Sequence, residues 1–510
     1  MTITSKLARL AAGVSLAALG AATVATAQPL ANPATPAPPE GAVTARIAPE
    51  GAPASFLRPR IGVQAAVTDN VDLASANERS DVIGRATVGL DGRYDSPRLK
   101  GNISGDVVYD VYNKAKKYDA LTYRGSVDGA FIVVPDMLAI EAAGARTQGS
   151  LTTFGSTDFF RLSNASDYQI GTYYVGPHLT ISPGILDISA AARYGQVFFD
   201  GPKSATVETL APETSIYQLI GAADTSDNLG RLRLVASGQY QKDDQSFEST
   251  AGSVSSFYEV TPRFSAIARA GYDDVQLTNV LDISTPFWSV GGQYVFNEMA
   301  NIRLEGGRRY DEAYWSGSAT LRVAQTVYLI ADYSNTLSPG PISINNVLVD
   351  YVGGLDKPLP IPVIPPTFGL NNNFFNLPSL NRTGSVRALF DLGRHQLDFV
   401  FTSTRQKFQT VSAENETWSQ SALYTNQVRP DLALSLRFLY ASERLDGALL
   451  VGPGGRDGYY YLTTAGAEYR LNRRTTVNVQ YQNRHFKPAA ATLLQGYDEN
   501  IGSIALVRTF

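Results

Sequence analysis

The chain has 510 residues, with 44 glycines, 27 tyrosines, no cysteine and a formal net charge of -4. The slightly negative charge argues against a nucleic-acid partner. The absence of cysteine excludes disulfides, thiolate chemistry and the lipid-attachment site of a lipoprotein. Any anchoring to a membrane therefore has to come from the fold.

The first residues have the three parts of a secretory signal. Lys6 and Arg9 supply positive charge, residues 10–25 form an alanine-rich apolar stretch, and small residues ending at Ala27 form a cleavage site. We predict that residues 1–27 are a signal peptide.

The composition changes after the signal. Residues 28–58 are rich in alanine and proline and do not bury enough apolar surface to offset the entropy of ordering, so we predict a flexible periplasmic tail. Beyond the signal, no apolar run reaches the roughly 18 residues of a helical membrane span. If the mature chain crosses a membrane, it does so as a closed β-barrel, which satisfies every backbone group in lipid.

From Arg60 onward, apolar and polar residues alternate with a period of two. In residues 99–111, for example, one face carries leucine, glycine, isoleucine, valine and tyrosine, and the other carries Lys100, Asn102, Ser104, Asp106 and Asp110. The alternation recurs in residues 121–133, 231–240, 432–440 and 476–482. Its length matches the roughly 10 residues of a tilted membrane strand. We predict an all-β fold in which residues 59–510 form a transmembrane antiparallel up-and-down β-barrel.

The connections between these strands alternate in length. Short turns fall at residues 95–98, 134–136, 182–184, 226–228, 261–263, 297–301, 324–326, 393–394, 429–431 and 472–474. Longer polar links fall between them at residues 69–81, 148–163, 200–213, 242–253, 407–416 and 442–458. This division is typical of bacterial barrels, with short turns in the periplasm and long loops outside. It gives about 22 strands, with about 16 to 20 as the alternative. A soluble β-propeller or solenoid is a further alternative, but no blade repeat is present.

One link departs from this pattern. Residues 338–379 are rich in proline and contain the apolar stretch 361–368, which water would solvate poorly. Long links inside compact folds are usually functional or disordered. We predict that this link folds over or into the lumen of the barrel.

The chain ends on an aromatic residue. In the predicted strand 501–510, Ile504, Leu506 and Phe510 share one face, although Arg508 stands where an apolar residue is expected. This ending resembles the insertion signature of outer-membrane barrels. The resemblance implies the outer membrane of a Gram-negative bacterium as the location, with its lipid and the barrel-assembly machinery as partners.

Three segments carry a more specific resemblance. Residues 67–73 (VTDNVDL), 80–93 (SDVIGRATVGLDGR) and 107–112 (VVYDVY) resemble the opening of the β-barrel porin 2 family. Its best-marked branch is associated with exosortase and exopolysaccharide gene clusters. The resemblance implies a link to polysaccharide export and assigns no catalytic residue.

Charged residues on the polar face of the strands are the candidate pore lining. A charge that faced hydrocarbon at the bilayer midplane would cost about 2–4 kcal/mol, so these residues must point inward. They are Arg85, Arg93, Asp106, Arg124, Asp128, Arg193, Arg231, Arg233, Arg303 and Arg437. Both signs mingle, so strong ion selectivity is not evident. Aromatic residues near strand ends predict an interfacial girdle, with a sugar-stacking platform as the alternative.

We expect no cofactor, no metal and no catalytic residue. The first hypothesis is a porin-like channel for hydrophilic solutes, with carbohydrate as the expected class. The alternative is a non-conducting outer-membrane component of exopolysaccharide biosynthesis or export, whose partners are polysaccharide or export-complex proteins. An outer-membrane enzyme comes third, and its one candidate pair is His485 with Asp498.

Overall fold

The computed structural model describes the chain from residue 55 onward with internal gaps. The described residues are 55–74, 76–150, 167–200, 213–226, 228–244, 247–277, 281–297, 300–338, 379–408, 413–447, 458–488 and 496–510. The predicted signal peptide and nearly all of the predicted tail lie outside them, as does the body of the proline-rich link. The first strand begins at Phe56, inside the stretch that the sequence assigned to the tail.

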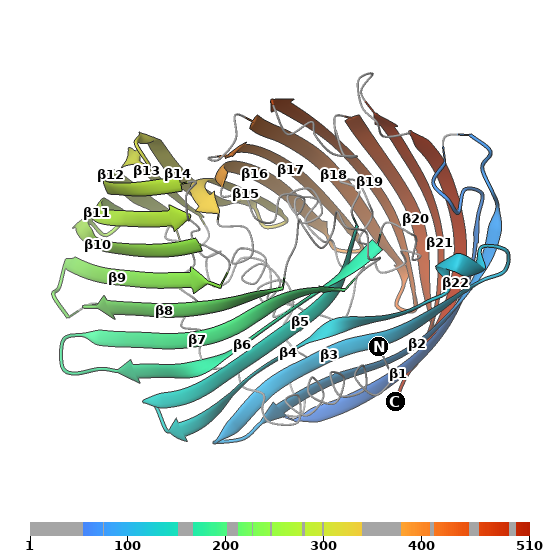
Figure 1. The fold of residues 1–510 in the computed structure, drawn as a ribbon, viewed down its shortest axis with the longest axis horizontal. Coiled ribbons are helices and arrows are strands. Elements are labelled where there is room, and N and C mark those ends of the chain that lie inside the picture. The colour runs from blue at the N-terminus through green and yellow to red at the C-terminus, as the bar shows by residue number, and fades with distance from the viewer. Residues whose placement is uncertain are drawn as a thin grey trace.

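Twenty-two strands form one antiparallel sheet in which each strand pairs with the next along the chain. β1 also pairs with β22, from Arg60–Thr509 to Thr68–Ile501, so the sheet closes on itself. Figure 1 shows this ring, with the C-terminus beside β1. The predicted barrel and its strand number are confirmed.

The strands are β1 (Phe56–Thr68), β2 (Asp81–Asp95), β3 (Leu99–Tyr112), β4 (Ala120–Val134), β5 (Leu138–Ser150), β6 (Asp167–Ile181), β7 (Asp187–Asp200), β8 (Thr214–Asp224), β9 (Leu232–Asp243), β10 (Phe247–Thr261), β11 (Phe264–Leu277), β12 (Leu281–Asn297), β13 (Ala300–Arg309), β14 (Glu312–Ala324), β15 (Val327–Ser338), β16 (Ser379–Leu392), β17 (His395–Phe408), β18 (Ala413–Arg429), β19 (Leu432–Gly447), β20 (Gly458–Asn472), β21 (Thr475–Pro488) and β22 (Tyr497–Thr509). A short 3-10 helix, η1 (Lys116–Tyr118), lies between β3 and β4. No helix in the described ranges is long and apolar enough to span a membrane.

The alternation of each strand separates an exterior face from a lumen face. On β1, Ile61 and Val63 are 47% and 60% exposed on the exterior, whereas Gln64 and Thr68 are 8% and 1% exposed on the lumen side. A closed barrel with exposed valine, leucine and aromatic side chains around its outside suits a hydrocarbon environment, because along most of the wall the sheet pairs its own backbone groups.

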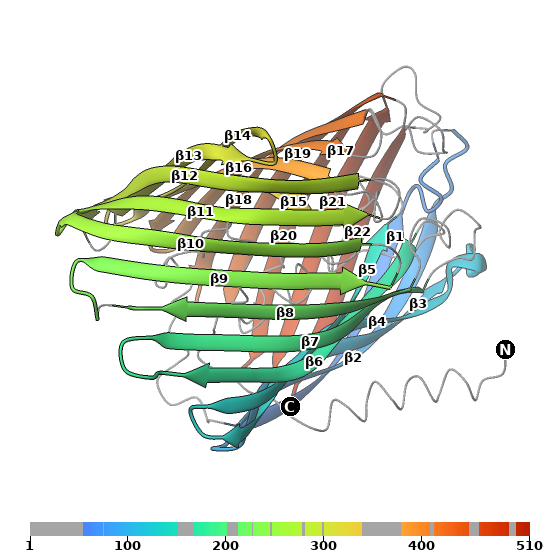
Figure 2. The same ribbon diagram turned by 60° about the vertical axis from the view of Figure 1, so that its left-hand side comes forward.

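The two ends of the barrel differ in their connections. All the short turns predicted from the sequence join strands at one end, which we call the short-turn end, and Figure 2 shows the strands running back and forth between the two ends. The opposite end is the long-link end. The predicted link 242–253 is wrong, since β9 continues to Asp243 and β10 begins at Phe247. At the long-link end, β9 and β10 extend beyond the part of the barrel whose exterior is apolar. Both faces tolerate polar side chains there, so the composition of these segments resembles that of a loop.

The long-link end is tightly built around β1, β2 and β3. Asp81 at the start of β2 accepts hydrogen bonds from the backbone N–H groups of Lys114 and Ala115, both 2.7–2.9 Å away. Tyr112 and Tyr118 pack edge to face within a buried apolar cluster that joins the links after β1 and β3. This corner is therefore an ordered part of the barrel rim.

The C-terminal strand lies as the sequence predicts. Ile504, Leu506 and Phe510 are exposed on the exterior face, and the Phe510 N–H donates to the Pro59 carbonyl at 2.9 Å. The Arg508 guanidinium lies 5.3 Å from the centre of the Phe510 ring. Arg508 thus shares the short-turn rim with an aromatic ring, which is a favourable place for a cation near the membrane interface.

Candidate functional site

The lumen face of β2 and β3 carries a buried ion pair. Arg85 donates from Nε and Nη2 to the two carboxylate oxygens of Asp110 at 2.6 and 2.8 Å. The two residues are cross-strand partners, and their side chains are 5% and 0% exposed. Such bidentate geometry is the strongest arrangement available to an arginine and a carboxylate.

A second network lies beside the first, nearer the short-turn end. Asp106 on β3 accepts from Arg60 on β1 at 2.9 Å and from Arg124 on β4 at 3.4 Å. Arg60 also pairs with Asp91, and Asn102 donates to Asp128 at 3.1 Å. Cations and anions from four neighbouring strands thus neutralise one another on this part of the lumen wall.

The same chemistry recurs around the lumen. The further pairs are Arg193 with Glu141, Arg303 with Glu305, Arg309 with Asp273, and Arg387 with Asp398. Arg309 and Asp273 are each 3% exposed at the side chain and make two hydrogen bonds of 2.7 and 2.8 Å. Sequence reasoning singled out Asp106 but missed Arg60, Asp91, Arg309 and Asp273, although their alternation was visible.

Four further arginines of the predicted pore lining occupy different settings. Arg231 precedes β9 and lies exposed in the turn after β8, so its predicted place on a strand face is wrong. Arg233 lies at the short-turn rim, where it pairs with Asp224 and its side chain is 53% exposed. Arg93 lies on the lumen face of β2, and Arg437 is buried on the lumen face of β19.

A second part of the lumen wall is uncharged, and sequence reasoning did not single it out. In the long-link half of β17 and β18 the lumen-facing residues are hydroxyl and amide side chains: Thr402, Thr404, Gln406, Asn415, Thr417, Ser419 and Ser421. All are buried, from 1% to 8% exposed. We call them, together with Thr464, Gln480 and Gln482 on β20 and β21, the neutral wall; β19, which lies between the two parts, adds the buried charges of Arg437 and Glu443.

Several polar atoms of the neutral wall have no hydrogen-bond partner within the described part of the chain. They are Gln406 Oε1, Asn415 Oδ1, Thr464 Oγ1, Gln482 Nε2 and both amide atoms of Gln480. A buried polar atom without a partner costs about 1–3 kcal/mol. Since folding alone does not reward such atoms, they indicate groups kept ready for a ligand or water.

Aromatic side chains divide between the two faces. Trp418, Tyr440 and Tyr461 form an exterior stripe at the long-link end, with ring centres 4.7 and 4.8 Å apart. Adjacent residues of a strand point to opposite faces, so where two aromatic residues follow one another, one ring points into the lumen. Phe287 lies under Arg309 in this way, and Phe257 lies near Arg303. The girdle is present, and the inward rings accompany arginines.

His485 and Asp498 are brought together, as the sequence pairing proposed. They are cross-strand partners on the exterior face of β21 and β22, with His485 Nδ1 in contact with the Asp498 carboxylate. Within the described residues, the ring of Tyr461 is the other neighbour recorded for His485, at 5.7 Å between centres. No serine or second acid joins this pair there.

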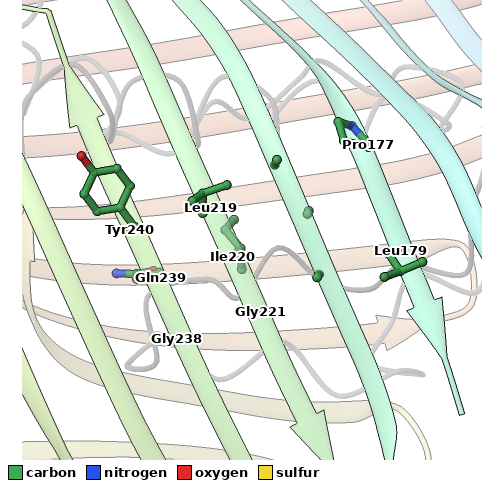
Figure 3. A pocket seen from close by; sticks show the side chains of 11 residues that line it. Pro177, Leu179, Leu219, Ile220, Gly221, Gly238, Gln239 and Tyr240 are labelled. Atoms are coloured by element: carbon green, nitrogen blue, oxygen red, sulfur yellow. The ribbon is translucent and has the colours of Figure 1, made fainter. Parts of the chain in front are cut away.

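The exterior carries a shallow apolar depression of about 500 Å³ over β6 to β9. Pro177, Leu179, Leu219 and Tyr240 surround it, and alanines and glycines form its floor, as the close view in Figure 3 shows. Its lining suits hydrocarbon and offers little to a hydrophilic solute.

A closed barrel with an apolar exterior, aromatic rims and a polar lumen defines the class: this is an outer-membrane β-barrel. No sequence-family model matches the chain, so the resemblance to the β-barrel porin 2 family stays a prediction. No curated protein matches either.

Solved structures match as barrels at low identity. A mutant of the ferric enterobactin receptor PfeA from Pseudomonas aeruginosa is 11% identical, with TM-score 0.49, and the match covers 89% of this chain and 80% of that one. The siderophore receptor PirA from the same species is 12% identical, with TM-score 0.47 and coverage of 90% and 81%. The FrpB iron transporter from Neisseria meningitidis is 9% identical, with TM-score 0.47 and coverage of 89% and 82%.

Proposed function

We propose that this barrel passes uncharged, hydroxyl-rich solutes, with carbohydrate as the main class. The observation that carries the proposal is the neutral wall with its unpartnered amide and hydroxyl atoms. Amides and hydroxyls both donate and accept, which matches the hydroxyl groups of a sugar. The proposal gives the barrel no catalytic role.

The charged part of the lumen supports the same conclusion. Ion pairs hold Arg85, Asp106 and Arg303, and likewise Arg193, Arg309 and Arg387, so these groups offer little net charge to a passing ion. Selection between cations and anions by side-chain charge uses a ring of residues of one sign. Mutual pairing instead leaves a lumen in which neutral solutes meet no electrostatic barrier.

A second candidate is a non-conducting partner of an exopolysaccharide export machine. The burial of the neutral wall favours it, since Thr404 and Asn415 are only 2% and 1% exposed although they face the lumen. In that case the same atoms would hold a glycan rather than line its path.

Current measurements and sugar binding separate these candidates. In planar bilayers, the first predicts step-like conductance with weak ion selectivity, and partial block by a neutral oligosaccharide such as maltohexaose.

Gln480→Leu removes two unpartnered atoms and should raise the half-blocking concentration several-fold. The control is Gln241→Leu, a buried lumen glutamine on β9 that has no unpartnered atom recorded. Conductance without sugar block contradicts the neutral wall, and absence of conductance with retained calorimetric binding favours the export partner.

A further inference from the structure

The ladder between β14 and β15 covers only the short-turn half of these strands. It runs from Ala324–Val327 to Gly317–Tyr333. Beyond that point, residues 312–316 of β14 pair with β13, and residues 334–338 of β15 pair with β16, up to Ser338–Ser379. Among the described residues, no ladder pair joins the long-link halves of β14 and β15. We call this parting of the wall the seam.

Side chains cross the seam where backbone pairing is missing. Glu312 on β14 reaches past β15, accepting from Arg382 on β16 and from Lys407 on β17, each at 2.6 Å. At the hairpin tip between β13 and β14, the backbone of Leu337 on β15 hydrogen-bonds the Tyr310 side chain. We call the Glu312 ion pairs the latch, because they join strands that the ladder leaves apart.

In the long-link half of β15, the exterior face of the strand is covered. Asn335 and Leu337 continue the exterior alternation of Tyr333, which is 40% exposed, yet they are 3% and 5% exposed. Leu380, the partner of Leu337 on β16, is 2% exposed. In a regular barrel wall these positions would face lipid. An overlapped wall of this kind can slide apart without the loss of a ladder hydrogen bond.

β4 and β5 part in a similar way beyond Gly125–Arg146. The side chains of β5 from residue 147 onward lie outside the described ones. The seam between β14 and β15, by contrast, is described on both sides up to Leu337, and Figure 1 shows its strands where the ring of the barrel bends.

A groove of about 570 Å³ lies on the exterior beside the seam. Its lining is apolar along Leu304, Val386 and Phe401. Arg382 and Arg405 lie among the same lining residues, as do the acids Asp332 and Glu416. An apolar floor next to guanidinium groups suits an amphiphile with a hydrocarbon chain and an anionic head. Because the groove is on the lipid-facing wall, its natural occupant is a membrane lipid with a phosphate head.

We propose that the seam is a lateral opening between the lumen and the membrane, held shut by the latch. A lipid phosphate in the groove competes with Glu312 for the donors of Arg382 and Lys407, which releases β14 from β16 and β17. This adds a sideways route for amphiphiles to the passage along the lumen. It does not depend on which solute the lumen passes.

Distance measurement across the seam tests the latch. The chain has no cysteine, so spin labels at Ala313→Cys on β14 and Gln420→Cys on β18 are unique, and both positions are exposed on the exterior. In phosphatidylcholine nanodiscs, Glu312→Gln should add a longer-distance population to the double electron–electron resonance trace. The heat-dependent gel shift of each variant shows that it is folded.

The matched control is Glu414→Gln. It removes the ion pair of Arg405 with Glu414, which joins β17 and β18, two strands with a continuous ladder. This variant should keep the parent distribution. Unchanged distances in Glu312→Gln, or an equal shift in Glu414→Gln, would overturn the latch.

The role of a lipid phosphate is tested with Glu312 intact. Replacement of part of the phosphatidylcholine by phosphatidylglycerol, which carries an uncompensated phosphate, should populate the same longer distance. If the latch variant shifts but the lipid change does not, a membrane phosphate is not the ligand and that part of the proposal fails.

Discussion

Arg85 and Asp110 form one of the ion pairs whose disruption should cost the barrel most. Both are buried, at 7% and 0% exposed, and loss of one partner leaves an uncompensated charge in a site of low polarity. Breaking a buried pair typically costs about 3–5 kcal/mol. We expect Asp110→Asn to lower the temperature at which the folded band disappears from unheated-sample gels.

The control for this substitution is Asp224→Asn. Asp224 pairs with Arg233, whose side chain is 53% exposed, and exposed pairs contribute about 0–1 kcal/mol. Its unfolding temperature should stay close to that of the parent. Equal losses in the two variants would mean that burial of the Arg85 pair carries no special weight.

For single residues, the sequence predicted which face of the barrel wall a side chain occupies better than it predicted the partner of that side chain. The period of two placed Arg85, Asp106 and Arg303 on the lumen side, because a register error would put charge into lipid. Arg231 was misplaced because the alternation Arg-Leu-Arg continues from the turn into β9. The neutral wall was missed since serine, threonine and glutamine carry no charge signal, and their burial depends on the closed barrel.

The corner formed by the links after β1 and β3 contains a carboxylate with a perturbed pKa. Burial raises the pKa of Asp72, but hydrogen bonds from Tyr118 and Lys117 and the charge of Arg79 outweigh it, so the pKa lies below its ordinary value. The Tyr118 hydroxyl donates to Asp72 at 2.7 Å, and Arg79 lies 3.0 Å away. The ionised carboxylate therefore stabilises this corner.

The sign of the pH dependence follows from the lowered pKa. The contribution of Asp72 is fully present above the ordinary value of about 4 and is lost as the pH falls through the lowered value. Hydrogen exchange in residues 70–74 and 113–119 should be slow at pH 7 and faster near pH 3. Asp72→Asn should exchange faster already at pH 7 and change less with pH. A variant that matches the parent at both pH values would contradict this role.

Whole strands were predictable where the alternation was long, and their number followed from the turns. The link at residues 242–253 was predicted wrongly because the ladder of β9 and β10 extends beyond the apolar belt, where polar residues occupy both faces. The seam was beyond sequence reasoning. It depends on which residues of β14 and β15 pair, and ladder register is a property of the assembled wall.

For the whole molecule, the difference between the two ends predicts its orientation. Long loops face the cell exterior in bacterial barrels, and short turns face the periplasm. Glu78→Cys, exposed in the link after β1, should react with a membrane-impermeant maleimide on intact cells. Asp136→Cys, exposed in the turn after β4, should react only after the outer membrane is opened. The reverse pattern would invert the barrel.

The pairing of β1 with β22 also fixes the order of events in assembly. Thr68 donates to Glu499, 431 residues further along the chain, so the wall closes only after nearly the whole polypeptide has been exported. Until then β1 presents an unpaired edge, and such edges recruit other chains. Closure of so long a loop is slow compared with pairing between adjacent strands. A chain cut before residue 501 would thus become an open sheet with two sticky edges instead of a smaller barrel, and its fate would be aggregation or proteolysis in the periplasm.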